Sequence, residues 1–366
     1  MSKNLSELSG RKGLEDNLFD RMGKLAQPDG APSKEELEAL AEEFLIGSAN
    51  TYGTSTFYDF LRPENKGKKA YVCNGSACVC AGTQNEVIDQ LKTKYKADEI
   101  GHMTCLGRCH ENSAFHIDGT NYSGDAINQL DTIVSDNDGP KDSYNVKASG
   151  KAILTAPFTD IDSYYSSFRA ALKRDAEEVL DEIKTSNVRG RGGAGFPMGL
   201  KLGFCRNEKS DTKFIICNAD EGDPGAYSDR YLLEEQPHSV LYGMLIAGYV
   251  TGAEWGVLYI RAEYPDSVAI IDREIEMLRM AGLVGENIDG SDFSFHFKII
   301  QAQGSYICGE ETALINSIEG QRPEVRVRPP YPAQQGLFNK PTVVNNVETL
   351  ASLHFMIENG GSAWKN

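Results

Sequence analysis

The chain has 366 residues, and 53 acidic against 37 basic side chains give it a formal net charge of -16. This acidity argues against a nucleic-acid surface and against adhesion to a membrane surface. No apolar run approaches the ~20 residues of a membrane span, and the first thirty residues mix charges instead of forming a signal-peptide core. We therefore expect a cytoplasmic protein of two or three domains, without direct membrane insertion, whose partners are other proteins.

The first 62 residues predict a helical segment. Apolar residues recur there at about helical spacing, namely Leu14, Leu18, Met22 and Leu25. Ser33 with Glu36 forms a capping box that begins a second helix. The apolar side of this helix is expected to consist of Leu37, Leu40, Phe44 and Leu45. Together these helices predict a small helical bundle that is not stable by itself.

Residues 63–138 predict a compact α/β unit. A short strand ends at Tyr71 and Val72, and a helix follows with its own capping box, Thr83 with Glu86. That helix is expected to present to the core Val87, Ile88, Leu91 and Tyr95. The segments 114–117 and 121–122 flank Asp118-Gly119, which is a hairpin signal. Cysteines lie on the loops of this unit.

Residues 139–366 predict a doubly wound sheet covered by helices on both faces. The polar stretch 134–162 places a domain boundary near Gly139 and Pro140. Apolar strands are expected at 214–217, 257–260 and 297–300, alternating with helices near 176–183, 238–250, 266–281, 310–318 and 345–349. Alternating strands and helices are typical of a parallel sheet with helices on its two faces.

Four of the eight cysteines are clustered, as C-x4-C and C-x3-C, at Cys73, Cys78, Cys105 and Cys109. Four thiolates from two loops can enclose a [2Fe–2S] cluster. Zinc uses similar loops, so spacing alone leaves both metals open. We expect the other cysteines to be packing or bystander thiols, namely Cys80, Cys205, Cys217 and Cys308.

A glycine-rich loop at 189–196 follows the helix near 176–183. Its backbone N–H groups can approach phosphate oxygens, although many such loops bind nothing. Three further motifs strengthen the interpretation: Asn218-Ala219-Asp220-Glu221-Gly222-Asp223-Pro224-Gly225, Tyr306-Ile307-Cys308-Gly309-Glu310-Glu311-Thr312 and Asn345-Asn346-Val347-Glu348-Thr349.

These motifs carry a resemblance to known families. Residues 71–78 with 105–109 resemble the thioredoxin-like [2Fe–2S] ferredoxin subunit of respiratory complex I and of NAD-linked hydrogenases and formate dehydrogenases, and residues 51–60 resemble the end of the helical segment preceding it. Residues 176–356 resemble the FMN- and NADH-binding flavoprotein subunit. The stretch between Cys78 and Cys105 is shorter than in the complex I version. The fusion in one chain is most similar to the diaphorase subunit of an NAD-linked hydrogenase or formate dehydrogenase.

The resemblance implies a multi-domain α/β protein: a helical segment at 1–62, a thioredoxin-like [2Fe–2S] domain at 63–138 and a Rossmann-like FMN- and NAD(H)-binding domain at 139–366. It implies that Cys73, Cys78, Cys105 and Cys109 are the ligands of the [2Fe–2S] cluster. It implies FMN contacts from Gly190, Arg191, Gly192, Gly193, Ala194, Asn218, Asp220, Glu221, Asn345 and Asn346.

For NAD(H), the resemblance implies that Lys201 contacts a phosphate group and that Glu311 binds the adenosine ribose. The other expected nucleotide contacts are Tyr306, Glu310, Arg328 and Tyr331, and the candidate catalytic residues are Asp223 and Glu221. Phe196 and Phe204 supply aromatic faces on which an adenine or nicotinamide ring can stack, with plain core packing as the alternative. For the charged run from Arg322 to Arg328, the alternative is a solvated surface. Three positions depart from the family pattern: Asp223, Arg328 and Tyr331 replace glutamate, lysine and phenylalanine. These departures bear on the choice between NADH and NADPH.

The expected function is an NAD(P)H:acceptor oxidoreductase, or diaphorase, module of an NAD-linked hydrogenase or formate dehydrogenase complex. Its expected partners are an iron–sulfur electron-transfer subunit and the hydrogenase or formate dehydrogenase catalytic subunits. The family flavoprotein continues into a [4Fe–4S] region, whereas this sequence has no cysteine after Cys308. Three alternatives remain: a complex I-like NADH dehydrogenase flavoprotein subunit, a truncated cluster-bearing scaffold without turnover, and a zinc- or thiol-based redox module.

Overall fold

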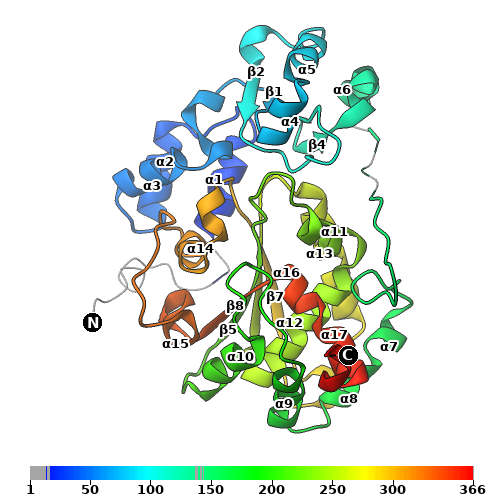
Figure 1. Cartoon of the computed structure of the whole chain (residues 1–366). Helices are drawn as coiled ribbons and strands as arrows, with labels where there is room; N and C mark the ends of the chain where they lie inside the picture. The colour runs from blue at the N-terminus through cyan, green and yellow to red at the C-terminus, as the bar shows by residue number, and fades with distance from the viewer. Residues whose placement is uncertain (1–13, 15–16, 137–138, 141, 143, 366) are drawn as a thin grey trace.

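The computed structural model describes residues 14, 17–136, 139–140, 142 and 144–365. Residues 1–13 and 15–16 of the predicted helical segment lie outside the described residues. Three parts are arranged around one another: N-terminal helices at one side, a small α/β unit at the top and a larger α/β unit below (Figure 1). No helix in the described ranges is long and apolar enough to cross a membrane.

The N-terminal part consists of α1 (Leu18–Ala26), α2 (Lys34–Glu43) and α3 (Ser48–Ser55). The predicted capping box is confirmed, since Glu36 N donates to Ser33 Oγ at 3.2 Å and Ser33 N donates to Glu36 Oε2 at 2.7 Å. The expectation for Leu45 is wrong: its side chain is 73% exposed. Its backbone adopts a φ of 53°, because the helix has already ended, and this directs the side chain away from the apolar side.

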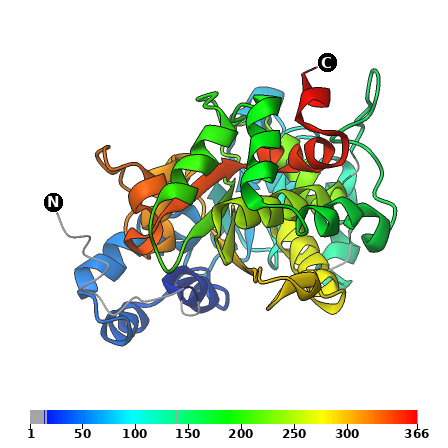
Figure 2. The ribbon, with the colours of Figure 1, turned by 90° about the horizontal axis from the view of Figure 1, so that it is seen from below.

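These helices do not form a separate core. Leu18 and Met22 of α1 belong to one buried cluster with strand residues of the larger unit, including Ile216 and Tyr259. Viewed from below, the N-terminal helices lie on the side of the large sheet opposite to α9 and α10 (Figure 2). The N-terminal segment therefore supplies one of the layers that cover the large sheet.

The small unit has a four-stranded sheet in the order β2–β1–β3–β4, with β1 (Ala70–Cys73), β2 (Ile100–Met103), β3 (Phe115–Ile117) and β4 (Thr120–Tyr122). Its helices are α4 (Ser76–Ala81), α5 (Gln84–Leu91) and α6 (Leu130–Asp136). Strands β3 and β4 form the predicted antiparallel hairpin. The predicted capping box at Thr83 is wrong, because Thr83 Oγ1 accepts instead from Ser113 N at 3.2 Å and makes no cap bond to α5.

The large unit has a parallel sheet in the order β7–β6–β5–β8, with β5 (Phe214–Ala219), β6 (Trp255–Ile260), β7 (His296–Gln301) and β8 (Thr342–Asn346). Its helices are α7 (Ile161–Tyr164), α8 (Ser166–Ala171), α9 (Ala176–Ser186), α10 (Met198–Asn207), α11 (Ser228–Glu235), α12 (Pro237–Thr251), α13 (Pro265–Met280), α14 (Glu311–Ile318), α15 (Pro332–Gln335), α16 (Val347–Ala351) and α17 (Leu353–Asn359). The predicted helix at 345–349 is wrong in its first two residues. Asn345 and Asn346 end β8, where they pair with β5, and α16 begins only at Val347.

Alternate residues of the strands face opposite helical layers. Ile215 and Cys217 of β5 pack into one cluster with residues of α9, α10 and α12, whereas Phe214 and Ile216 pack with the N-terminal helices and α14. This confirms a sheet covered on both faces.

The chain enters β6 on one side of β5 and returns to β8 on the other, so the strand order reverses between β5 and β8. In open parallel sheets, ligands bind at the carboxyl ends of the strands at such a point.

Candidate functional site

The four clustered cysteines come together in space. Cys73 ends β1, Cys78 lies in α4, and Cys105 and Cys109 lie on the loop after β2. Cys105 Sγ and Cys109 Sγ are 3.6 Å apart. Contacts with the Cys105 and Cys78 thiols raise the pKa of Cys73, and its contact with Cys73 lowers the pKa of Cys78 to about 7. Sulfur atoms from two loops thus form one group of potential ligands.

The surrounding backbone fits an iron–sulfur cluster. Gly75 N donates to Cys73 Sγ at 3.3 Å, which is the kind of bond that stabilises a thiolate. A Cβ at Gly75 would lie only 3.0 Å from Thr104 O and 3.2 Å from Cys105 Cβ. A glycine here therefore allows the two cysteine loops to approach each other. This geometry suits [2Fe–2S] and four-thiolate zinc equally.

A cavity of about 1010 Å³ opens at the carboxyl ends of β5 and β8, at the reversal point of the large sheet. It is large enough for a cofactor together with part of a second nucleotide. The predicted residues that line it are Gly190, Gly192, Ala194, Phe196, Lys201, Phe204, Asn218, Glu310, Glu311, Arg328, Tyr331, Asn345 and Asn346.

The glycine-rich loop forms one wall of this larger cavity. Gly193 and Gly195 have φ values of 108° and 62°, and a Cβ at either position would meet no atom within 4 Å. Glycine is needed there for backbone conformation and not for space. Arg191 N donates to Thr349 Oγ1 at 2.9 Å, which ties the loop to α16. Arg191 and Gly193 are not among the described residues that line the cavity.

Two buried polar atoms beside the larger cavity have no hydrogen-bond partner, Asp220 Oδ2 and Asn345 Nδ2. Unsatisfied buried groups are costly and are normally satisfied by a ligand or water. Burial raises the pKa of Asp220 to about 8, while Arg261 opposes the shift. One carboxyl and one amide thus offer an acceptor and a donor, as the polar edge of a flavin ring requires.

The expected nucleotide contacts also line the larger cavity. Phe196 and Phe204 are 43% and 53% exposed, and their ring centroids lie 6.4 Å apart. They are therefore available aromatic faces, whereas plain core packing would bury them. Lys201 Nζ donates to Val344 O at 2.9 Å and lies 3.7 Å from Glu311 Oε2. Burial lowers the pKa of Lys201, and Glu311 opposes this shift.

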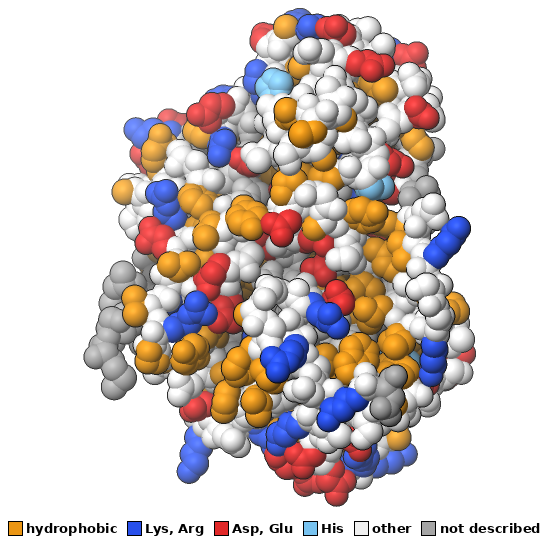
Figure 3. All heavy atoms as spheres, in the orientation of Figure 1, with side chains coloured by type: hydrophobic (Ala, Val, Ile, Leu, Met, Phe, Trp, Pro, Cys, Tyr) orange, Lys and Arg blue, Asp and Glu red, His pale blue; other side chains and the backbone are white. Residues whose placement is uncertain are grey.

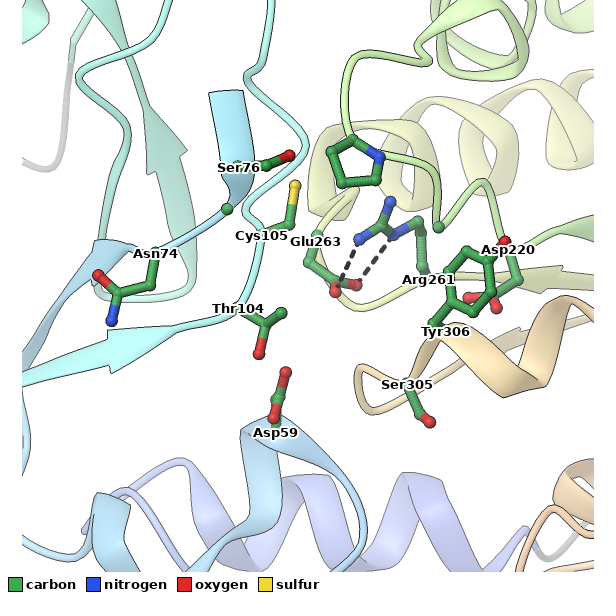
Figure 4. A pocket seen from close by; sticks show the side chains of 13 residues that line it. Asp59, Asn74, Ser76, Thr104, Cys105, Asp220, Arg261, Glu263, Ser305 and Tyr306 are labelled. Atoms are coloured by element: carbon green, nitrogen blue, oxygen red, sulfur yellow. Dashed lines mark hydrogen bonds and ion pairs between the residues drawn. The ribbon is translucent and has the colours of Figure 1, made fainter. Parts of the chain in front are cut away.

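A smaller cavity of about 220 Å³ lies between the cysteines and the larger cavity. Figure 4 shows Cys105 on one side, with Asp220 and Tyr306 on the other and the Arg261–Glu263 ion pair between them. Gly309, which lines the larger cavity, approaches the far side of Asp220: a Cβ at Gly309 would lie 3.6 Å from Asp220 Oδ2. Asp220 therefore stands between the two cavities.

Sequence reasoning did not identify Arg261 and Glu263 as site residues. The available signal was their position directly after the apolar strand β6, at the carboxyl edge of the sheet. Charged residues that follow a buried parallel strand lie at the ligand-binding edge.

The two candidate catalytic residues are placed differently. Asp223 is exposed, and Tyr306 Oη donates to its Oδ1 at 3.0 Å. Glu221 lines neither cavity in the described part of the chain. Its carboxylate accepts from Asp229 N at 3.0 Å and Tyr264 Oη at 3.0 Å, so it secures the start of α11. Burial raises the pKa of Glu221.

Acidic side chains gather in the middle of the face shown in Figure 3, between the small unit at the top and the large unit below, with Lys and Arg side chains farther down. A four-thiol site that faces a flavin-sized cavity across a small second cavity is typical of a flavoprotein with a thiolate-bound metal centre, a class to which iron–sulfur electron-transfer proteins belong.

Comparison with known protein families identifies two domains in this chain. Residues 14–138 match the thioredoxin-like [2Fe–2S] ferredoxin family, and residues 183–354 match the Nuo51 FMN-binding domain. The chain therefore carries a thioredoxin-like [2Fe–2S] ferredoxin domain followed by a Nuo51 FMN-binding domain, as the resemblance predicted. The match favours [2Fe–2S] over zinc as the metal centre of the small unit.

Relatives and solved structures agree with this assignment. The chain is 50% identical over 196 residues to the NADP-reducing hydrogenase subunit HndC of Solidesulfovibrio fructosivorans, covering 54% of this chain and 40% of that protein. It is 45% identical over 204 residues to a subunit of the NADH-quinone oxidoreductase of Aquifex aeolicus, covering 56% and 48%. An NAD⁺-reducing [NiFe]-hydrogenase structure superposes with a TM-score of 0.78 and 28% identity, over 95% of this chain and 62% of that chain. The chain thus spans less than half the length of these two curated relatives.

Proposed function

We propose that the protein is an NAD(P)H:acceptor oxidoreductase, or diaphorase, module that exchanges a hydride between NADH and FMN and single electrons with iron–sulfur centres. The observation that carries this proposal is Asp220, whose unpartnered carboxyl oxygen stands between the larger cavity and the cavity that Cys105 lines. A flavin and a cluster held at these two places are neighbours. Bound FMN supplies the conversion of a two-electron donor into one-electron steps.

The roles of this chain's residues are binding and orientation. We assign Gly190, Gly192 and Ala194 to the FMN phosphate wall, and Asn218, Asp220 and Asn345 to its polar ring. Phe196 and Phe204 offer stacking faces to a dinucleotide, and Lys201, Glu311 and Arg328 form a charged group for its ribose or phosphate. Asp223 accepts a hydrogen bond from Tyr306, which lines the small cavity, and we keep it as the candidate catalytic carboxylate. No side chain is required as a nucleophile.

The module is proposed to work in the cytoplasm, within an NAD-linked hydrogenase or formate dehydrogenase complex whose other subunits oxidise hydrogen or formate. A reducing compartment suits the eight cysteines, none of which forms a disulfide in the described structure. We retain residues 1–62, 63–138 and 139–366 as its helical, ferredoxin and FMN/NAD(H) units. A complex I-like role remains the alternative, since an NADH-quinone oxidoreductase protein is also among the relatives of this chain.

The first test is the visible spectrum of anaerobically purified protein, with flavin, iron and acid-labile sulfide content, before and after NADH or NADPH is added. We expect a flavin band to bleach and the iron–sulfur absorbance to fall. A protein that holds the cluster and supplied FMN but responds to neither nucleotide would contradict the diaphorase assignment and favour a scaffold role.

A further inference from the structure

A network of buried charges lies directly beside the second cysteine loop. Arg108 stands between Cys105 and Cys109 in sequence, and its side chain is only 2% exposed. Arg230 of α11, in the FMN-binding domain, is fully buried. Buried guanidinium groups are costly unless paired, so both arginines require close acidic partners.

The shared partner is Asp142, which lies on the segment that joins the ferredoxin and FMN-binding domains. Asp142 Oδ2 is 2.8 Å from Arg108 Nη1 and also forms an ion pair with Arg230. Tyr144, two residues on, donates from its Oη to Glu234 Oε2 at 2.7 Å, and Arg230 Nε donates to Glu234 Oε1 at 3.0 Å. The connecting segment is therefore built into the interface. Its sequence predicted only a polar domain boundary.

Both arginines also donate hydrogen bonds to acceptors in the opposite domain. Arg230 Nη1 donates to Gly107 O, in the middle of the cysteine loop, at 3.2 Å, and Arg108 Nη2 donates to Asp266 Oδ2 of α13 at 2.8 Å. Gly107 itself has a φ of 70°, and a Cβ there would lie 2.4 Å from the Tyr264 ring. The loop thus approaches the FMN-binding domain as closely as glycine permits.

Aromatic rings pack around Tyr144 beside this network. The Tyr144 ring stacks on His110 and Tyr227 at centroid distances of 6.0 and 6.3 Å and meets Tyr231 edge-on at 5.4 Å. The Arg230 guanidinium lies over the Tyr144 ring, 5.4 Å from its centroid. These rings and the two buried guanidinium groups make a low-dielectric junction in which ion pairs resist separation. A flexible, solvated linker would need none of these contacts.

We propose that Arg108, Asp142 and Arg230 form a lock that fixes the cluster-bearing loop on the FMN-binding domain, and that fast electron exchange between FMN and the [2Fe–2S] cluster depends on it. These are positioning residues, since none of the three is among the described residues that line either cavity. The proposal rests on the proposed function, because it assumes that the flavin and the cluster exchange electrons.

The test compares Asp142→Asn with the matched control Asp211→Asn, which changes an exposed aspartate paired with Lys340 on the large domain. Stopped-flow mixing with NADH follows flavin bleaching and cluster reduction in the same trace. We expect Asp142→Asn to slow cluster reduction about tenfold, because small misplacements of reacting groups have large effects on rate. Flavin bleaching, iron and sulfide content should match the control.

Tyr144→Phe provides a milder second variant, since it keeps the ring and removes only the bond to Glu234. It is expected to slow cluster reduction less than Asp142→Asn. The EPR spectrum of the dithionite-reduced cluster gives a readout independent of NADH, and we expect it to change in Asp142→Asn and not in Asp211→Asn. Unchanged cluster-reduction rates and EPR spectra in both Asp142→Asn and Tyr144→Phe would overturn the proposal. Failure of NADH to bleach the unmodified flavoprotein would instead contradict the proposed function, while the EPR comparison would still test the lock.

Discussion

Arg328 Nη1 donates to Glu311 Oε1 at 2.8 Å in the wall of the larger cavity. The other carboxylate oxygen of Glu311 lies 3.7 Å from Lys201 Nζ, so this acidic side chain is held between two cations. A carboxylate accepts hydrogen bonds from ribose hydroxyls and repels a phosphate group, whereas Lys201 and Arg328 attract a phosphate group. The balance among these three side chains is therefore expected to decide between NADH and NADPH.

Replacing Glu311 with glutamine tests this balance. Glu311→Gln removes the negative charge that Lys201 and Arg328 share, while Arg328 keeps its ion pair with Glu310. We therefore expect the ratio of kcat/KM for NADPH to that for NADH to rise at least about tenfold. Steady-state kinetics with an artificial electron acceptor measure the ratio. Glu324→Gln is the control, because Glu324 is exposed and does not line the cavity. An unchanged ratio would show that Glu311 does not face the adenosine ribose.

The two exposed phenylalanines are expected to bind a dinucleotide and to contribute little to stability. Phe204→Ala should weaken NADH binding about three- to tenfold, as expected for the loss of one aromatic contact. Its thermal unfolding should stay close to that of the unmodified protein because the ring is already half exposed. Leu200→Ala, on the same helix and 47% exposed but outside the cavity, is the matched control. Equal NADH affinities in the two variants would contradict the stacking role.

Cys73→Ser is expected to abolish the [2Fe–2S] cluster and to leave flavin reduction by NADH intact. The reason is spatial: Cys73 belongs to the ferredoxin sheet, whereas the larger cavity is formed by the other domain. Iron and acid-labile sulfide assays, with the flavin spectrum before and after NADH, measure both outcomes. Cys80→Ser changes an exposed cysteine outside the cluster motif and should retain iron. Loss of the flavin response together with the cluster would show that the two sites do not fold as separate modules.

The sequence predicted the parts of the structure that depend on local pattern. The strands at β5, β6 and β7, the hairpin and the cysteine loops all follow from apolar runs, turn residues and spacing. Strand β8 was not predicted, because Thr342–Asn346 ends in two asparagines whose strand pairing depends on β5, more than a hundred residues away. Asp142 was not predicted for the same reason. Its partner Arg230 is distant in sequence and becomes a neighbour only in the folded chain.

The buried Asp220 carboxyl predicts a pH dependence of stability in the FMN-free protein. Burial raises its pKa from 3.8 to about 8 in the folded state. Below pH ~4 the carboxyl is protonated in both the folded and the unfolded chain, so its contribution to stability is complete there. Between pH ~4 and ~8 the unfolded chain releases this proton and the folded chain keeps it, so the free energy of unfolding falls as pH rises. Above pH ~8 both states are ionised and the loss is complete.

Asp220→Asn should remove this dependence, because an amide has the same shape and does not titrate. We expect the FMN-free variant to be at least about 1 kcal/mol more stable than the unmodified protein at pH 8, with little difference at pH 4. Urea unfolding at several pH values measures both. Asp211→Asn is the control, since Asp211 is exposed and its pKa is lowered by Lys340, which confines its effect to more acidic solutions. Parallel pH profiles for Asp220→Asn and the unmodified protein would mean that Asp220 is ionised in the folded state. The interpretation of Asp220 as a neutral carboxyl between the two cavities would then be wrong.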